Sequence, residues 1–337
     1  MKIIVDAMGG DNAPKEIVKG SVEAAEKLGV EVVLVGREEA VKAELAECNY
    51  SGDAITIHNA EEVISNEDDP IAAIRHKKDS SMRVGLSLLA KGEGDAFVSA
   101  GSTGALISGA TLIVKRIKGI RRAALAPVLP SVNGNYLLID SGATAECTPG
   151  FLKQFGIMGS VYMKKVMGIE NPRVGLVNIG TEEEKGTEVI RQANKLLKEV
   201  PINYIGYVES REVPLGGADV VVCDGFTGNI ILKFMEGMGS AFSKMLKGVF
   251  LKNAMSKVAA LIVKSGIKEI KASMDYTEHG GAPVLGVRGP VVKAHGSSNA
   301  KAFYNAIRQC KKIVDGNLVG DITEGIAEYG LEEDEAE

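Results

Sequence analysis

Short apolar runs alternate with longer amphipathic stretches along most of this 337-residue chain. The apolar runs predict strands at 2–6, 31–36, 54–58, 95–99, 204–208 and 219–223, and the amphipathic stretches predict helices between many of them. Strands that alternate with helices form a mostly parallel sheet with helices on both faces. We therefore predict an α/β protein with three α/β/α layers.

The composition argues against several classes of protein. A net charge of −5, 5% aromatic residues and the absence of tryptophan give no basis for nucleic-acid binding. The four cysteines are far apart, so neither a zinc site nor a disulfide scaffold is indicated, and a reducing compartment is expected. The sequence has no apolar run of about 18 residues and no signal-peptide pattern. We expect a cytoplasmic protein.

Six turns at predicted strand ends combine glycine with residues that bind anions. In the turn at 99–104, Gly101 and Gly104 allow a ligand close to the backbone, and Ser102 and Thr103 add hydroxyl donors ahead of a helix. An ordinary βα turn has a similar composition, so one such turn is weak evidence. The carboxyl ends of parallel strands share one edge of a sheet, so six turns predict a common polar site. The other five turns lie at 6–14, 178–186, 224–229, 280–286 and 295–300.

Three side chains are candidates for direct chemistry. Lys185 lies in a glycine-bracketed turn just before a helix, where it can pair with phosphate, or else with the three glutamates that precede it. Asn229 can donate its amide to an oxyanion or serve only the turn. His295 can donate to a phosphate or carbonyl oxygen, or serve only to cap the following helix together with Ser297.

The remaining candidates form a set for binding phosphate or substrate. Among them, Asp6 can orient a lysine or an amide, although an aspartate at a strand end often serves turn geometry. No nucleotide-binding loop, H-E-x-x-H helix or G-x-S-x-G elbow occurs, so neither metal chemistry nor a covalent Ser or Cys mechanism is indicated. The set comprises Asp6, Asn12, Ser99, Gly101, Ser102, Thr103, Gly104, Asn178, Asp224, Ser297 and Asn299.

Taken in order, these motifs resemble those of the PlsX family of bacterial phosphate acyltransferases. Each motif alone is weakly specific, whereas the ordered set is highly specific and covers residues 1 to about 330. The motifs are Asp6-Ala-Met-Gly-Gly-Asp, Ser99-Ala-Gly-Ser-Thr-Gly-Ala105, Asn178-Ile-Gly-Thr-Glu-Glu-Glu-Lys-Gly186, Asp224-Gly-Phe-Thr-Gly-Asn229, Gly280-Gly-Ala-Pro and His295-Gly-Ser-Ser-Asn-Ala300.

The resemblance implies a fold similar to phosphotransacetylases and to isocitrate and isopropylmalate dehydrogenases, with two lobes around a cleft in a homodimer. It implies that an acyl group passes from acyl-carrier-protein thioester to inorganic phosphate, giving acyl phosphate for phospholipid synthesis. It implies no cofactor, because the phosphopantetheine arm arrives on the carrier protein. We expect residues 1–330 to form one intertwined enzyme domain and the acidic tail at 331–337 to be disordered.

Phosphate is a dianionic nucleophile near neutral pH, so the site has to bind it, align it with the thioester and stabilise an oxyanion. We expect Lys185 and the 99–104 turn to hold phosphate, and Asn229, His295 or backbone N–H groups to serve the oxyanion. Two other activities stay open at this point. One is a phosphate acetyl- or butyryltransferase that uses coenzyme A, and the other is an NAD-dependent decarboxylating dehydrogenase, although its paired metal-binding aspartates are not evident.

Residues 240–272 form a basic segment in an acidic protein. Apolar residues recur there at helical spacing among lysines, which fits a core-facing helix with its lysines reaching solvent. It also fits docking of the acidic carrier protein by charge, or contact with an anionic membrane surface. The resemblance favours a peripheral membrane protein; a non-enzymatic membrane adaptor has no other support. The candidate docking residues are Leu251, Lys252, Met255, Lys257, Val258 and Ile262.

Overall fold

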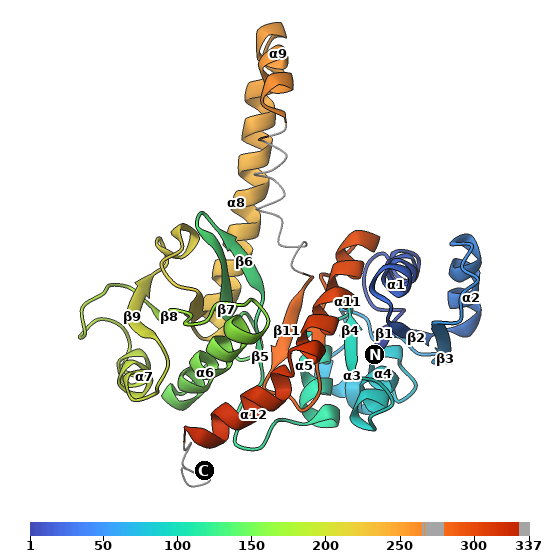
Figure 1. Cartoon of the computed structure of the whole chain (residues 1–337), viewed down its shortest axis with the longest axis horizontal. Coiled ribbons are helices and arrows are strands. Elements are labelled where there is room, and N and C mark those ends of the chain that lie inside the picture. The colour runs from blue at the N-terminus through green and yellow to red at the C-terminus, as the bar shows by residue number, and fades with distance from the viewer. Residues whose placement is uncertain (265, 267–279, 330–337) are drawn as a thin grey trace.

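The computed structural model describes residues 1–264, 266 and 280–329, and it contains two β-sheets, each flanked by helices (Figure 1). The first sheet has seven strands in the order β3-β2-β1-β4-β12-β11-β5. Pairing is parallel from β3 to β12, and antiparallel for β11 with both of its neighbours. The strands are β1 (Lys2–Asp6), β2 (Glu31–Gly36), β3 (Ile55–Asn59), β4 (Ala96–Ser99), β5 (Ala124–Leu125), β11 (Ala282–Leu285) and β12 (Val291–Lys293).

Both faces of the first sheet are covered because its central strands are apolar on both sides. In β1, Ile3 and Val5 join one buried cluster and Ile4 joins another, as alternate side chains of a strand must. One face carries α1 (Lys15–Leu28) and α11 (Ala300–Asp315), with α2 (Glu38–Glu47) beside α1. The other face carries α3 (Pro70–His76), α4 (Ser81–Ala90), α5 (Thr103–Gly109) and the π-helical turn η1 (Ala110–Val114).

The second sheet has five strands in the order β6-β7-β10-β8-β9, with only β6 antiparallel to its neighbour. Its helices α6 and α7 pack on one face, and Ile231 and Leu232 of α8 (Gly225–Leu251) pack against the other. The strands are β6 (Val128–Ser131), β7 (Gly134–Ile139), β8 (Val174–Asn178), β9 (Tyr204–Glu209) and β10 (Val220–Val222). The helices are α6 (Pro149–Lys165), α7 (Glu188–Lys198) and the 3-10 turn η2 (Val213–Leu215).

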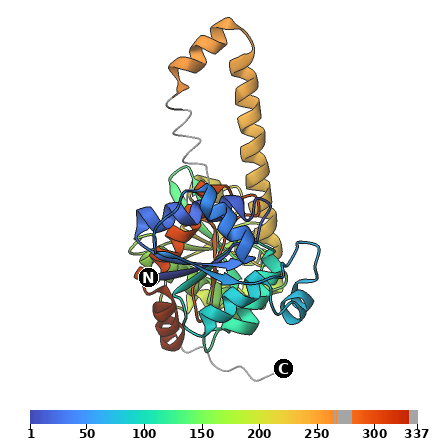
Figure 2. The same ribbon diagram turned by 90° about the vertical axis from the view of Figure 1, so that its right-hand side faces the viewer.

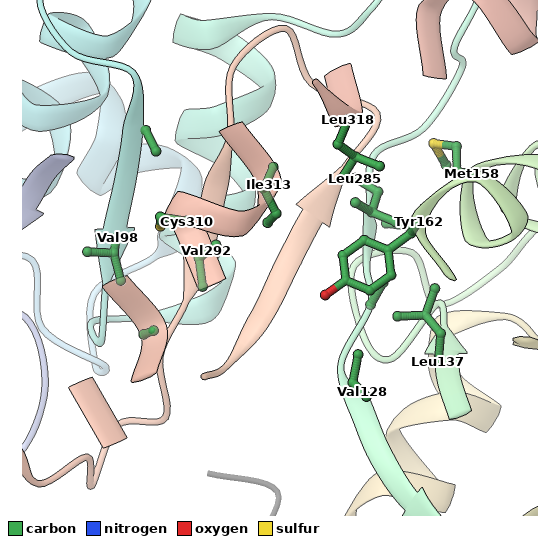
Figure 3. Close-up of a cluster of buried hydrophobic side chains, with 14 of the residues drawn as sticks. Val98, Val128, Leu137, Met158, Tyr162, Leu285, Val292, Cys310, Ile313 and Leu318 are labelled. Carbon is green, nitrogen blue, oxygen red and sulfur yellow. The ribbon is translucent and has the colours of Figure 1, made fainter. Parts of the chain in front are cut away.

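One buried cluster joins the two sheets. Figure 3 shows Val292 and Ile313 from the first lobe together with Leu137, Met158 and Tyr162 from the second. The chain builds β1–β5, continues through the second sheet, and returns to complete the first sheet with β11 and β12. The last helix, α12 (Leu318–Glu328), packs on α6. The predicted α/β class is thus confirmed, with one mostly parallel sheet in each lobe.

Two helices project from this body as an arm (Figure 2). The arm consists of α8 (Gly225–Leu251) and α9 (Ala254–Ile262). Among its residues only Gly225 and Gly228 are buried, so over the described part of 240–272 that α8 and α9 cover, the interpretation as a core-facing helix is wrong. The helix is also interrupted: Asn253 caps α9 by accepting a hydrogen bond from the Ser256 N–H at 2.8 Å, which puts Leu251 on a different helix from Met255.

Two sequence predictions lie outside the described residues. These are the acidic tail at 331–337 and the part of the basic segment at 265 and 267–272. Asn12, a candidate for the binding set, does not cap the first helix, although asparagine is a common N-cap residue. Pro14 occupies the N-cap position, and the Asn12 amide instead donates to the Ser297 and Ser298 carbonyls, both at 3.2 Å.

Candidate active site

Asp6 organises the carboxyl end of the first sheet. It ends β1, is 1% exposed, and accepts hydrogen bonds from the hydroxyls of Ser81 and Ser99, each at 2.6 Å, and from the Met8 N–H at 3.2 Å. Burial raises the pKa of Asp6, while these hydrogen bonds oppose that shift by stabilising the carboxylate. The carboxyl group therefore ties β1 to β4 and α4 from the inside of the protein.

The 99–104 turn follows β4 directly, but not all of its donors face outward. The Ser99 hydroxyl is fully buried, donates to Asp6 and accepts the Gly101 N–H at 3.0 Å. Ser99 and the Gly101 N–H therefore brace the turn, and a ligand has to use other donors. Ser102 is the residue before α5, and its hydroxyl makes no capping hydrogen bond; Thr103 and Gly104 are partly exposed.

The loop after β12 packs against the loop after β1. The Asp11 N–H donates to the Gly296 carbonyl at 2.8 Å, alongside the Asn12 hydrogen bonds described above. Nδ1 of His295 lies 2.8 Å from the Ser297 hydroxyl, and burial lowers the pKa of this imidazole. Asn299 caps α11 by accepting the Ala302 N–H at 2.9 Å, so its side-chain oxygen is already engaged.

A second strand-end aspartate organises the other sheet. Asp140 follows β7, is fully buried, and accepts backbone N–H groups from Leu125 and from residues 142–144 at 2.7–3.2 Å. Burial raises its pKa, and these N–H groups oppose the shift. The turn it holds meets the start of α8, where the Gly225 N–H donates to the Thr144 carbonyl at 2.8 Å. A Cβ at Gly228 would clash with the Asp140 carbonyl, so only glycine permits this approach.

Asn229 lies on the first turns of α8, exposed and facing Gly142 of this second turn. Asp224 is the N-cap of α8 and accepts the Thr227 N–H at 2.7 Å and the Thr227 hydroxyl at 3.1 Å. The Asp224 carboxylate is thus used within the helix start. The Asn229 amide is the group that this helix presents to solvent beside the Asp140 turn.

Lys185 lies in the turn after β8, which is closed by the Asn178 amide donating to the Lys185 carbonyl at 3.1 Å. Its side chain is exposed and forms no ion pair with any described residue, including the glutamates at 182–184. Glu183 pairs with Lys198 instead, at 2.6 Å. The structure thus shows no direct ion pair between Lys185 and those glutamates, and the alternative in which Lys185 is their solvated partner stays open.

The arm's first helix connects the two sets of loops. Lys233 and Glu236, paired at 2.8 Å on α8, both lie close enough to His295 to act on its pKa. The structure thus brings the loops at 6–14, 99–104 and 295–299 together, and joins them through α8 to Asn229. No hydrogen bond or ion pair between described residues connects Lys185 or Asn178 to this group.

Two buried charged residues at strand ends, one in each sheet, were missed in the sequence analysis. Lys293 is 8% exposed at the end of β12, and its only signal was a charged residue inside an otherwise apolar strand. Asp140 introduces Ser-Gly-Ala-Thr, a turn composed like the one at 99–104, and that similarity is the signal that would have found it.

The candidate docking residues lie on the arm. All six are exposed, and Met255 is exposed to 82%. No helix among the described residues is long and apolar enough to cross a membrane. Within the same residues, no cluster of three or more His, Cys, Asp or Glu side chains could hold a metal ion.

Structural comparison extends over nearly the whole chain. A phosphotransacetylase from Streptococcus pyogenes aligns with a TM-score of 0.65 and 17% identity, covering 95% of this chain and 94% of that one. A branched-chain phosphotransacylase from Enterococcus faecalis V583 aligns with a TM-score of 0.57 and 14% identity, covering 93% and 99%. At these identities the likeness establishes the fold.

Sequence comparison is more specific. The model of the family described as fatty acid synthesis protein matches residues 1–320. The chain is 51% identical over 333 residues to a phosphate acyltransferase of Alkaliphilus oremlandii, covering 99% of both chains. It is also 51% identical over 333 residues to a phosphate acyltransferase of Thermoanaerobacter pseudethanolicus, covering 98% of this chain and 99% of the relative. The chain therefore belongs to the fatty acid synthesis protein family, together with these phosphate acyltransferases.

Proposed function

We propose that this phosphate acyltransferase takes a fatty acyl group from acyl-carrier-protein thioester and transfers it to inorganic phosphate. The acyl phosphate formed would feed phospholipid synthesis. The observation that carries this proposal is the set of anion donors at strand ends that the loops at 99–104 and α8 supply, namely the Ser102 and Thr103 hydroxyls and the Asn229 amide. We add Lys185 on its chemistry alone, since its exposed ammonium group pairs with no carboxylate among the described residues. Such donors suit a reaction in which both the nucleophile and the intermediate are anionic.

The roles follow from exposure and chemistry. Lys185 and the 99–104 turn would hold phosphate, with the buried Ser99 and Asp6 bracing the turn. Asn229 and His295 would donate to the carbonyl oxygen as it becomes an oxyanion. A phosphate oxygen attacks the thioester carbon, the C–O bond forms, the C–S bond breaks, and the carrier's thiolate leaves and takes up a proton.

Direct attack is favoured because the thiols are poor nucleophiles in this protein. Burial raises the pKa of Cys48, Cys223 and Cys310, and raises that of Cys147 to about 12. A protonated thiol does not attack a thioester at neutral pH. Intact-mass measurement after mixing with acyl-carrier thioester, without phosphate, should show unmodified protein; a stoichiometric acyl adduct would make covalent catalysis the mechanism.

The test of the function is consumption of purified acyl-carrier thioester with and without phosphate. We expect phosphate-dependent release of free carrier thiol and formation of acyl phosphate. Equal or better turnover of acetyl- or butyryl-coenzyme A would favour the coenzyme A-dependent activity instead. Phosphate-independent reduction of NAD by an added 2-hydroxy acid that is oxidised and decarboxylated, followed by absorbance, would indicate dehydrogenase chemistry.

We also propose that the tip of the arm contacts an anionic membrane surface. Leu251 and Ile262 are exposed there among lysines, on helices that project away from the body formed by the other described residues. Changing both to Glu should release the protein from anionic vesicles and leave turnover in solution intact, while Val132→Glu on the exposed β6–β7 turn should change neither. Retained vesicle binding with lost turnover on carrier thioester would make the tip the carrier-docking surface.

We also propose that the protein forms a homodimer, in which the rest of the arm contacts a second copy of the chain. Apolar side chains recur at every fourth position along α8 and are all exposed, which leaves a stripe for a second copy to cover. Phe234→Glu should lower the sedimenting mass to that of one chain; an unchanged mass would contradict this. The stripe consists of Phe226, Ile230, Phe234, Met238 and Phe242.

A further inference from the structure

A buried lysine lies beneath the loops of the candidate site. Lys293 ends β12, and the parallel pairing of β12 with β4 sets it opposite Ser99. Its ammonium group forms no ion pair with any described carboxylate, although the residue is only 8% exposed. Proteins rarely bury a lysine in this way, because removing an ammonium group from water is costly. Its position therefore calls for a function.

The ammonium group fastens loops together. Nζ donates to the Ala100 carbonyl at 3.2 Å and also to the Ala294 carbonyl. Ala100 lies within the 99–104 turn, and Gly10 of the loop after β1 packs between Ala100 and the Gly296 carbonyl. The loops after β1, β4 and β12 thus meet at Ala100, whose carbonyl accepts a hydrogen bond from Lys293.

Charged groups face Lys293 from several elements. Asp6 at the end of β1 and Asp11 in the loop after it raise its pKa, whereas burial, the largest influence, and Lys233 on α8 lower it, to about 8. The strands beside it, β4 and β11, carry no titratable side chain, and α11 brings Cys310, whose pKa is raised by burial. His295 lies two residues after Lys293 in the sequence, and burial lowers the pKa of its imidazole.

We propose that Lys293 is a positioning residue of the phosphate site. Lys293 holds the 99–104 turn against the loop after β12, and its ammonium group supplies positive charge beneath the bound phosphate. This inference rests on the proposed function, in which the protein binds phosphate at the 99–104 turn. Because the ammonium group donates to main-chain carbonyls, it acts through the turn and through its charge. The ligand it favours is a small inorganic oxyanion.

The first test compares Lys293→Met with Lys27→Met, which removes the same charge from the exposed surface of α1. Lys293→Met should raise the KM for phosphate about tenfold or more, with the KM for carrier thioester within about twofold of wild type, because ground-state binding of one substrate is lost. Lys27→Met should leave both constants unchanged. Equal rises in both constants for Lys293→Met would indicate a merely structural role and overturn the proposal.

The second test uses sulfate as a competitor of phosphate, because sulfate keeps its charge between pH 7 and 9.5. In the wild type, sulfate inhibition should weaken as pH rises through about 8. In Lys293→Met the inhibition constant should stay flat over the same range. Should Lys293→Met fail to fold, the wild-type profile still decides, since a flat profile in the wild type contradicts the proposal.

A third variant separates this proposal from the function on which it rests. Ser102→Ala with Thr103→Val removes the two hydroxyls of the turn and leaves Lys293 in place. If the double variant leaves the KM for phosphate unchanged, phosphate does not bind at this turn and the site assignment fails. If the double variant raises that KM but Lys293→Met changes neither the KM nor the sulfate profile, only the role of Lys293 is overturned.

Discussion

Lys185 and Lys293 stand at the carboxyl ends of the two sheets in opposite surroundings. Lys185 is exposed, in a turn held by Asn178, and its ammonium group has no ion-pair partner among the described residues. Lys293 is buried and donates to two main-chain carbonyls. An exposed lysine can bind a substrate without moving its neighbours, whereas a buried one acts through what it holds. If the proposed roles hold, the same residue type would contact substrate in one lobe and hold the loops in place in the other.

The largest expected effect is the loss of activity in Lys185→Ala. Phosphate-dependent turnover should fall about 10²-fold, because the variant removes the positive charge to which we assign phosphate binding. Thermal stability should not change, since the side chain is exposed and unpaired. Initial rates at several phosphate concentrations measure the effect, with the exposed Lys195→Ala on α7 as control. Near-normal turnover at low phosphate would remove Lys185 from the site. It would also contradict the comparison between a substrate-binding Lys185 and a positioning Lys293.

The buried lysine should show itself in the pH dependence of stability. Its pKa is about 8 in the folded protein and 10.5 in the unfolded chain, so the unfolded chain binds more protons between these values. Stability of the wild type should therefore rise relative to Lys293→Met between pH 8 and 10.5, by about 1–3 kcal/mol. Urea unfolding of both proteins at pH 7 and pH 10 measures the difference. A constant difference would show that Lys293 does not titrate in the folded state over this range.

A smaller effect is expected for Ser99→Ala. The variant removes the donor to Asp6 and the acceptor of the Gly101 N–H, so stability should fall by about 1–2 kcal/mol. Turnover should fall less than in Lys185→Ala, because the hydroxyl braces the turn from inside. Ser87→Ala, which removes a hydroxyl bonded only within α4, is the control. Activity loss as large as that of Lys185→Ala would place Ser99 in contact with substrate.

The smallest effect is expected for Lys198→Ala, which breaks the exposed ion pair with Glu183. Such pairs contribute little in water, so melting temperature and turnover should both stay within experimental error. Differential scanning fluorimetry and the thioester assay measure the two quantities. A clear fall in turnover would mean that this ion pair holds the turn that carries Lys185. Activity would then depend on held loops in the second lobe as well as in the first.

Much of the fold was readable because strand and helix patterns are local. The run at 2–6 and the glycine-rich turn after it predict β1 and its strand-end loop without knowledge of the rest of the chain. The existence of two sheets depends on pairings between distant segments, such as β12 with β4. Local patterns do not encode such pairings, and they are needed to show that Lys293 faces Ser99.

The arm shows the same limit from another side. Apolar spacing at 251–262 fits a helix that faces a core, and only the tertiary structure shows that no core covers it. The break before α9 was in fact signalled, because Asn253 precedes Ser256 at the spacing of an N-cap. The site residues Ser99 and Asn299 were found by composition, but their hydrogen bonds to Asp6 and Ala302 decide what they do.

One consequence of α8 concerns mechanics. Its 27 residues form a single rod roughly 40 Å long, which carries Asn229 near its inner end and meets α9 at its outer end. Among the described residues of one chain, only the inner turns of α8 contact the body, so within that chain a load on the outer end acts as a lever about the first turns. A tilt of one degree displaces the tip by roughly 0.7 Å over that length. Under the proposed roles, binding at the tip would therefore be coupled to the orientation of the Asn229 amide, to which we assign the reacting carbonyl.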